Sequence, residues 1–240
     1  GEIRDLAGET LTSLQEKYAS SFGQKRYPAT QAYRAECSRP ENFYLPSNSP
    51  LSYQLRSQLD TDELGAWEGL LRDRPQKTEL PFWMVDLGLL KWLYTLDYAS
   101  WRDLQRHRAC THRVSLLTTR IGFQQWYLEQ LPDEMRAEAE QLLAFVAETL
   151  QGMPGSDVDK QYLTPIGYLV NASIAGGLPG VVYALDLRST LFIHPTLRSL
   201  VHRMGESLNE VHPSVTLHLD KTQSDWDVRR GDQTIQKKKK

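Results

Sequence analysis

Residues 87–108, "LGLLKWLYTLDYASWRDLQRHR", contain the change of pattern that decides the fold class. The run from Leu87 to Tyr98 mixes apolar and aromatic residues without a clean period, and we interpret its second half as a buried strand. This strand leads directly into a short helix that carries Arg102 to Arg108. The basic residues are therefore expected on the last turn of that helix and at its exit.

Helical patterns flank this stretch on both sides. Residues 133–151 give the clearest pattern, because Pro132 stands at the start, acidic residues fill the first turn and Gly152 ends it. Further helices are predicted over residues 1–21, 60–74 with Thr61 as the cap, 123–130, 178–187 and 196–210. We expect a turn and a strand after residue 161, a short edge strand over 214–218, and an irregular loop over 22–52. Helices that alternate with two or three strands imply an α/β or α+β domain.

The length of the chain, 240 residues, is sufficient for one sizeable core. We expect an N-terminal helix and loop over residues 1–52, an α/β domain over 53–220 and a polar Lys-rich tail over 221–240, with one domain overall. The tail ends in Lys237 to Lys240, a run that is typical of disordered termini.

The overall composition excludes several classes of protein. With a formal net charge of -2, the chain has no global attraction to nucleic acid or to an anionic membrane, so neither is expected as a partner. No apolar run reaches the roughly 18 residues of a membrane span, and the N-terminus has no signal-peptide pattern. Cys37 and Cys110 lie far apart and favour free thiols in a reducing compartment. We therefore expect a cytoplasmic protein.

The segment of residues 101–120 concentrates five arginines and two histidines. Guanidinium groups are planar, permanently charged forks that suit phosphate, and the positive neighbours of His107 favour its neutral form. A basic helix end of this kind is either a solvated surface or an anion site, and the residue pattern leaves both interpretations open.

Motifs for other chemistries are absent from the sequence. There is no GxGxxG, P-loop, HExxH or GxSxG motif, and the six histidines show no recurring metal-ligand spacing. Metal catalysis and a serine triad are therefore disfavoured, and no metal site is expected.

Several blocks, taken together, resemble the flavin-dependent thymidylate synthase family, and a divergent branch of it most closely. Arg106, His107 and Arg108 match the Arg-His-Arg of the family signature, and Thr118 to Arg120 approximate its Ser-x-Arg, with threonine in place of serine. "QYLTPIGY" from Gln161, "YALDLRS" from Tyr183 and "HPTLR" from His194 resemble further blocks of that branch in the same order. The resemblance spans roughly residues 60 to 205.

The resemblance implies a twisted mixed sheet flanked by helices, assembled as a homotetramer with shared FAD sites. It implies an FAD-dependent enzyme that converts dUMP, or a related pyrimidine nucleotide, to dTMP with methylene-tetrahydrofolate as the carbon donor and NADPH as the reductant. By motif, Arg106, His107 and Arg108 would bind the cofactor. The substrate-binding residues would be Gln105, Thr118, Arg120, Gln161 and Arg188, with Arg188 and Thr118 in catalytic positions.

One departure from the family pattern opens an alternative function. Where the family carries an Asn-x-Arg that helps to hold FAD, this chain has Gly177-Leu178-Pro179, which offers neither a side-chain hydrogen bond nor a charge. The alternative is a non-catalytic nucleotide-binding or scaffolding paralogue that has lost FAD binding. In a third interpretation the basic cluster is merely solvated.

Overall fold

A computed structural model describes residues 2–22 and 27–223 of the chain. The chain divides into two compact units, residues 1–43 and residues 44–240. Of the tail predicted over 221–240, the part from residue 224 onward lies outside the described residues. No helix in the described ranges combines the length and apolar character that a membrane span requires.

The first unit consists of helices without a buried residue among those described: α1 (Glu2–Lys17), α2 (Pro28–Cys37) and α3 (Pro40–Phe43). The predicted N-terminal helix is confirmed. The irregular loop predicted over 22–52 is wrong for α2 and α3. Pro28 and Pro40 each stand at the first position of a helix, where a proline loses no hydrogen bond and its φ already suits the helix.

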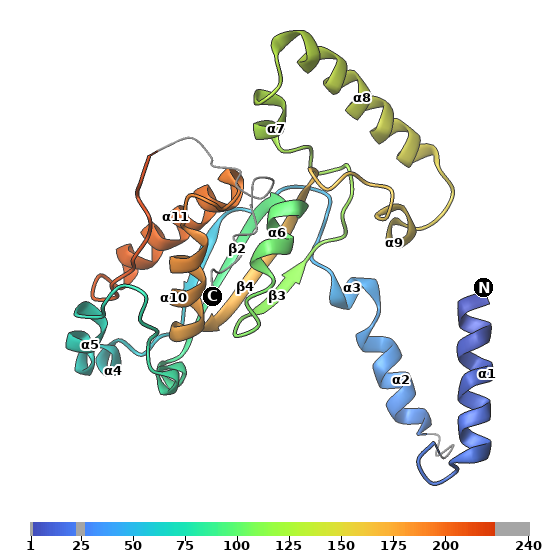
Figure 1. Ribbon diagram of the computed structural model, residues 1–240, viewed down its shortest axis with the longest axis horizontal. Coiled ribbons are helices and arrows are strands. Elements are labelled where there is room, and N and C mark those ends of the chain that lie inside the picture. The colour runs from blue at the N-terminus through green and yellow to red at the C-terminus, as the bar shows by residue number, and fades with distance from the viewer. Residues whose placement is uncertain (1, 23–26, 224–240) are drawn as a thin grey trace, which may run out of the picture. The chain divides into compact units, whose positions relative to one another are not determined.

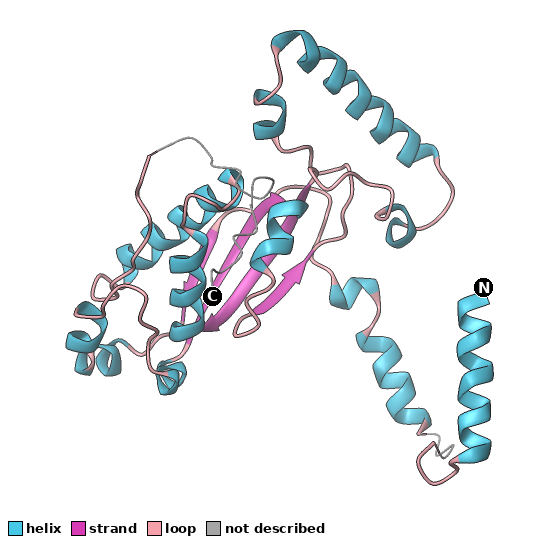
Figure 2. Ribbon diagram, in the orientation of Figure 1, coloured by secondary structure: helices cyan, strands magenta, loops and turns pink. Residues whose placement is uncertain are grey.

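The second unit is built on a four-stranded sheet in the order β1-β2-β4-β3 (Figures 1 and 2). The strands are β1 (Gln54–Ser57), β2 (Leu89–Asp97), β3 (Thr111–Val114) and β4 (Leu169–Gly177). All three pairings are antiparallel, and a parallel contact occurs as the isolated bridge from Leu45 to Ser115. β2 and β4 pair along their whole length, from Leu89 opposite Gly177 to Asp97 opposite Leu169. The expected class of a sheet flanked by helices is confirmed.

Three helices cover one face of this sheet (Figure 1): α6 (Tyr98–Leu104), α10 (Leu178–Arg188) and α11 (Pro195–Val211). Alternate residues of β2 point into the core beneath them, so that Trp92 and Tyr94 are each 1% exposed. Leu178 and Met204 pack into the same core from the helices. Burial of one such large side chain stabilises the fold by about 1.5–3 kcal/mol, and this packing fixes the strand-to-helix junction at Asp97.

The other helices of the unit are α4 (Thr61–Ala66), α5 (Glu68–Arg72), η1 (Phe82–Leu87), α7 (Gln125–Glu129), α8 (Asp133–Gly152) and α9 (Asp157–Lys160). The single helix predicted over 60–74 is interrupted at Trp67. Its cap is Asp60 rather than Thr61, because the Asp60 carboxylate accepts from the backbone N–H groups of Asp62 and Glu63 at 3.0 Å.

The edge strand predicted over residues 214–218 is wrong. This segment forms no ladder, because its backbone N–H groups bond to partners outside the sheet. Thr216 N donates to the carbonyl of Leu71, and His218 N donates to the carboxylate of Asp186 at 2.8 Å. The segment lies against α5 and α10 instead.

Candidate functional site

The basic cluster lies at the exit of α6, as the sequence predicts. Asp97 caps the start of α6 by accepting from Ser100 N at 2.8 Å, and the helix ends at Leu104. Two turn hydrogen bonds then shape the exit, from His107 N to Leu104 O at 3.2 Å and from Cys110 N to His107 O at 3.0 Å. This turn presents the Arg-His-Arg triplet beside α10.

His107 and Arg188, both predicted site residues, are in direct contact. Arg188 Nε donates to His107 Nε2 at 2.9 Å, and Arg188 Nη1 donates to Asp103 Oδ2 at 3.2 Å. His107 is buried, and the side chains of Arg188 and Asp103 are only 13% and 20% exposed. The guanidinium of Arg188 is therefore held in one orientation by two partners.

The contact with Arg188 defines the protonation state of His107. Because Arg188 Nε donates, His107 Nε2 accepts, and the ring is neutral with its proton on Nδ1. Burial, followed by the positive charge of Arg188 and by His112, lowers the pKa of His107 to about 4. The Nε2 lone pair is thus already engaged within the chain.

The remaining guanidinium groups of the cluster face solvent. The side chain of Arg106 is 68% exposed and lies 3.7 Å from Asp103 Oδ1, and Gln105 and Arg108 are exposed. Within the described part of the chain, Arg102 and Arg108 form no ion pair. Residues 102–108 and Arg188 thus carry four arginines and one carboxylate, and two of these arginines, Arg106 and Arg188, contact it.

The other predicted residues form a second group near α9. Arg120 Nη2 donates to Asp157 Oδ2 at 2.7 Å and to Ser47 Oγ at 3.0 Å, and the hydrogen bond from Arg120 lowers the pKa of Asp157. Thr118 is buried, and its hydroxyl accepts from Arg120 N at 3.4 Å. Gln161 Nε2 donates to the carbonyl of Val158 at 3.1 Å.

The two groups are attached to opposite ends of β4. Thr111, at the end of the turn that carries His107, pairs with Ala175, whereas Gly122, just after Arg120, accepts from Leu169 N. The six-residue separation from Leu169 to Ala175, at about 3.3 Å per residue, places these attachment points about 20 Å apart. The chain brings together His107 and Arg188, but it does not bring either of them to Thr118, Arg120 or Gln161.

Two carboxylates that position the arginines were not predicted. Asp103 precedes Arg106 by three residues near the end of a predicted helix, a spacing at which helical side chains meet, so the sequence did contain a usable signal. Asp157 lies far from Arg120 in the sequence, and no local pattern connects them.

The residues at the start of α10 do not fit FAD in the way that the resemblance implies. Gly177 is the N-cap of α10, without a side-chain cap. A Cβ added at Gly177 would overlap Val85 Cγ2 and would lie 3.1 Å from Val85 Cα, so η1 fills the space that an asparagine side chain would need. Gly177 therefore offers no polar side chain to a flavin, and at His107 the Nε2 lone pair is already engaged by Arg188.

Comparisons with known proteins find relatives in sequence and alignments with solved structures. No protein-family model matches the chain. It is 31% identical over 149 residues to UPF0159 protein Ta1429 of Thermoplasma acidophilum, across 61% of this chain and 29% of that protein. It is 27% identical over 128 residues to a UPF0159 protein of Chlamydia muridarum, across 50% of this chain and 23% of that protein. The chain thus spans less than a third of the length of these relatives.

Among solved structures, the chain aligns with flavin-dependent thymidylate synthase ThyX of Helicobacter pylori, complexed with FAD and dUMP. The TM-score is 0.39 and the sequence identity is 16%, over 55% of this chain and 74% of that one.

Proposed function

We propose that this chain binds a pyrimidine nucleotide, dUMP or a close relative, with the phosphate held by the guanidinium groups at the exit of α6. The observation that supports this proposal is the local charge balance: residues 102–108 and Arg188 carry four arginines and one carboxylate, that of Asp103, in a chain of net charge -2. A phosphate relieves the repulsion among these cations, and its oxygens accept bidentate hydrogen bonds from the guanidinium N–H groups.

Arg188 is the residue that we assign to the pyrimidine base. Its Nε and Nη1 are engaged with His107 and Asp103, whereas its Nη2 has no hydrogen-bond partner in the described part of the chain. The free N–H groups are therefore pre-oriented. A fixed cation of this kind stabilises negative charge that develops on a base carbonyl without reorganising.

We further propose that Arg120, Thr118 and Gln161 serve a nucleotide site that a second copy of the chain completes. The separation of about 20 Å between the attachment points on β4 supports this arrangement, because a single nucleotide is shorter than that span. A homo-oligomer, a tetramer by resemblance, would bring the α6 exit of one copy to the α9 region of another.

Two versions of this function differ in chemistry. In the first, the chain is a flavin-dependent enzyme that methylates dUMP with methylene-tetrahydrofolate and NADPH. In the second, it binds the nucleotide without methylating it. The packing of Val85 against Gly177 favours the second version, because it leaves no room for a side chain that would hold FAD.

Titration with dUMP tests the binding proposal. Arg106→Gln and Arg108→Gln should each weaken dUMP binding about tenfold, which corresponds to about 1.4 kcal/mol for the loss of one charge-assisted contact. Arg39→Gln, at an exposed arginine of the first unit, is the matched control and should bind like the wild type. Equal affinity of all four proteins for dUMP would show that the cluster is merely solvated.

Flavin content separates the two versions. The enzyme should carry flavin absorbance after purification and release tritium from dUMP labelled at C5. The binding protein should be colourless, should not take up added FAD, and should still be stabilised by dUMP in thermal unfolding.

A further inference from the structure

A cavity of about 410 Å³ lies between the loop that follows α5 and the outward face of α10. Residues 76–80 form one wall, Val182, Tyr183 and Leu187 form the other, and His218 and Asp220 also line the space. This volume falls within the range of small-molecule sites.

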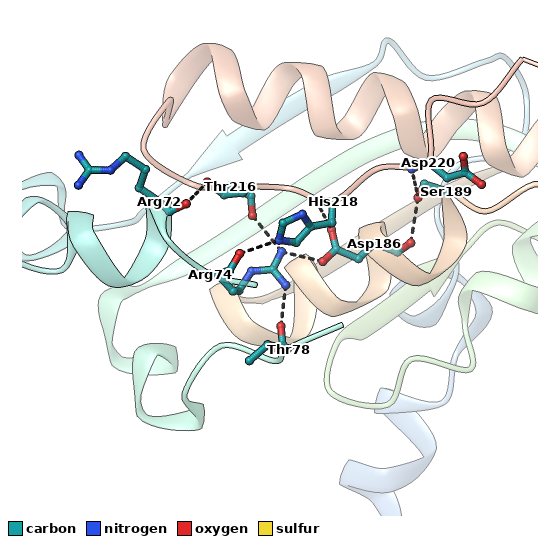
Figure 3. A network of polar contacts seen from close by, with 8 residues as sticks. All are labelled: Arg72, Arg74, Thr78, Asp186, Ser189, Thr216, His218 and Asp220. Carbon is teal, nitrogen blue, oxygen red and sulfur yellow. Dashed lines mark hydrogen bonds and ion pairs between the residues drawn. The ribbon is translucent and has the colours of Figure 1, made fainter. Parts of the chain in front are cut away.

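The cavity has a preformed polar frame centred on Arg74, whose side chain is 4% exposed. Arg74 Nη2 donates to Asp186 Oδ2 at 2.7 Å and to Thr216 O at 2.9 Å, and Nη1 donates to Thr78 O at 2.6 Å. These contacts join the loop, α10 and the segment of residues 215–220 (Figure 3). Both terminal nitrogens of Arg74 are engaged in this frame, and its charge is paired with the Asp186 carboxylate at 2.7 Å.

Hydrogen-bond acceptors are left for a ligand. His218 Nε2 donates to the Arg74 carbonyl at 2.8 Å, which makes Nδ1 of the neutral ring an acceptor. The carboxylate of Asp220 accepts from Leu191 N at 3.3 Å and from Thr222 N at 3.0 Å. A carboxylate has about four acceptor positions, so Asp220 can receive further donors.

The charges that line the cavity have a negative balance. Three carboxylates, those of Glu79, Asp186 and Asp220, stand against the two cations Arg74 and Lys77. An anion such as phosphate is therefore disfavoured, and a neutral or cationic ligand is favoured. This balance is opposite to that at the exit of α6, so the cavity requires a ligand group of different chemistry.

The apolar part of the lining suits a flat ring. Tyr183 and Leu187, 46% and 43% exposed, lie on one face of α10, where they can pack against a planar group. Lys77, on the opposite wall, has a φ of 63° and is the one non-glycine residue with positive φ in the described ranges. Such strain amounts to about 1–3 kcal/mol and clusters at ligand-binding positions.

We infer that this cavity binds a compact planar molecule with N–H donors, such as an aryl amidine or an amino-substituted heterocycle. Its ring packs against Tyr183 and Leu187, and its N–H groups donate to the Asp220 carboxylate and to His218 Nδ1.

Benzamidine, benzamide and benzoate test this inference, because they share one ring and differ in charge. Amide chemical shifts of the full chain would be followed by NMR during titration with each compound. Leu187→Trp fills the cavity from an exposed position, Asp220→Asn removes the carboxylate at constant size, and Leu142→Trp, at an exposed leucine of α8, is the matched control.

Benzamidine should bind the wild type with a Kd on the order of 1 mM and shift the amide signals of residues 183–187. Benzamide should bind at least about tenfold more weakly, and benzoate should not bind. Leu187→Trp should lose this binding, Leu142→Trp should retain it, and Asp220→Asn should weaken it about tenfold. The inference is overturned if none of the three compounds binds saturably, if benzoate binds as well as benzamidine, or if Leu187→Trp binds benzamidine like the wild type.

Discussion

Acidification is expected to break the contact between His107 and Arg188 and to destabilise the fold. In the folded protein Arg188 Nε donates to His107 Nε2 at 2.9 Å, and this contact requires an unprotonated Nε2. Protonation would place two N–H donors and two positive charges against each other in a buried position. His107 should therefore resist protonation until the pH falls well below the ordinary histidine range.

The magnitude follows from the pKa of His107, which the fold lowers from 6.5 to about 4. Between these two values the unfolded chain binds a proton at His107 and the folded chain does not, so the free energy of unfolding falls as the pH falls through this window. At about 1.4 kcal/mol per pKa unit the full effect is at most about 3 kcal/mol, of which about 2 kcal/mol is lost between pH 7 and pH 4.5. Above pH 6.5 the stabilisation is fully present.

Urea unfolding of the wild type and of His107→Gln at pH 7 and pH 4.5 measures this effect. Glutamine keeps an acceptor for Arg188 and does not titrate, so the variant should lose about 2 kcal/mol less stability on acidification than the wild type. The pKa values of His194, His202 and His212 are also lowered by burial, but those residues titrate in both proteins and cancel in the comparison.

Ring ¹⁵N chemical shifts provide an independent measurement. They should show the Nδ1–H form of His107 at pH 7 and a pKa of about 4. Arg188→Met removes the second cause of the lowered pKa, so the pKa should rise toward 6.5 without reaching it, because burial is the larger cause. A wild-type pKa at or above 6.5, or a proton on Nε2, would refute this reasoning.

Two further predictions concern the stability of the fold, and urea unfolding measures both. The buried carboxylate of Asp97 accepts from a threonine hydroxyl, a tyrosine hydroxyl and a backbone N–H. Asp97→Ala leaves these three donors without an acceptor and should lower the free energy of unfolding by about 3–5 kcal/mol. The control Asp133→Ala, at a side chain 90% exposed, should change the free energy of unfolding by less than about 1 kcal/mol. Gly88→Ala places a Cβ against the Gln58 carbonyl at a φ of 121° and should destabilise the fold by clearly more than Gly122→Ala, where φ is 112° but no atom lies within 4 Å of the added Cβ. Equal effects within either pair would contradict the packing described.

The elements that the sequence predicted well carry their own signals. α8 was expected over 133–151 and spans Asp133–Gly152, and α10 was expected over 178–187 and spans Leu178–Arg188. A proline at the start, acidic residues in the first turn and a glycine at the end act on the neighbouring backbone itself. The junction of β2 with α6 was equally readable, because it depends on a local change from an apolar run to charged residues.

The sequence did not predict the short strands β1 and β3. Each has only four residues and none of them is buried, so the sequence of these strands shows no distinctive hydrophobic pattern. They exist because β2 and β4 offer them free edges, which is a property of the assembled sheet. The α2 and α3 helices were missed for a different reason, since a proline in the sequence indicates either a helix start or a break.

The composition of the candidate site was determined by the sequence, and its geometry was decided by the tertiary structure. The concentration of arginine around His107 is visible in the chain itself, and so is the absence of a polar side chain at Gly177. Only the packing of α10 beside the α6 exit joins Arg188 to His107 and Asp103, and only the length of β4 separates them from Arg120. Local residue types set charge and donor chemistry, whereas distances between remote segments depend on how the sheet positions its helices.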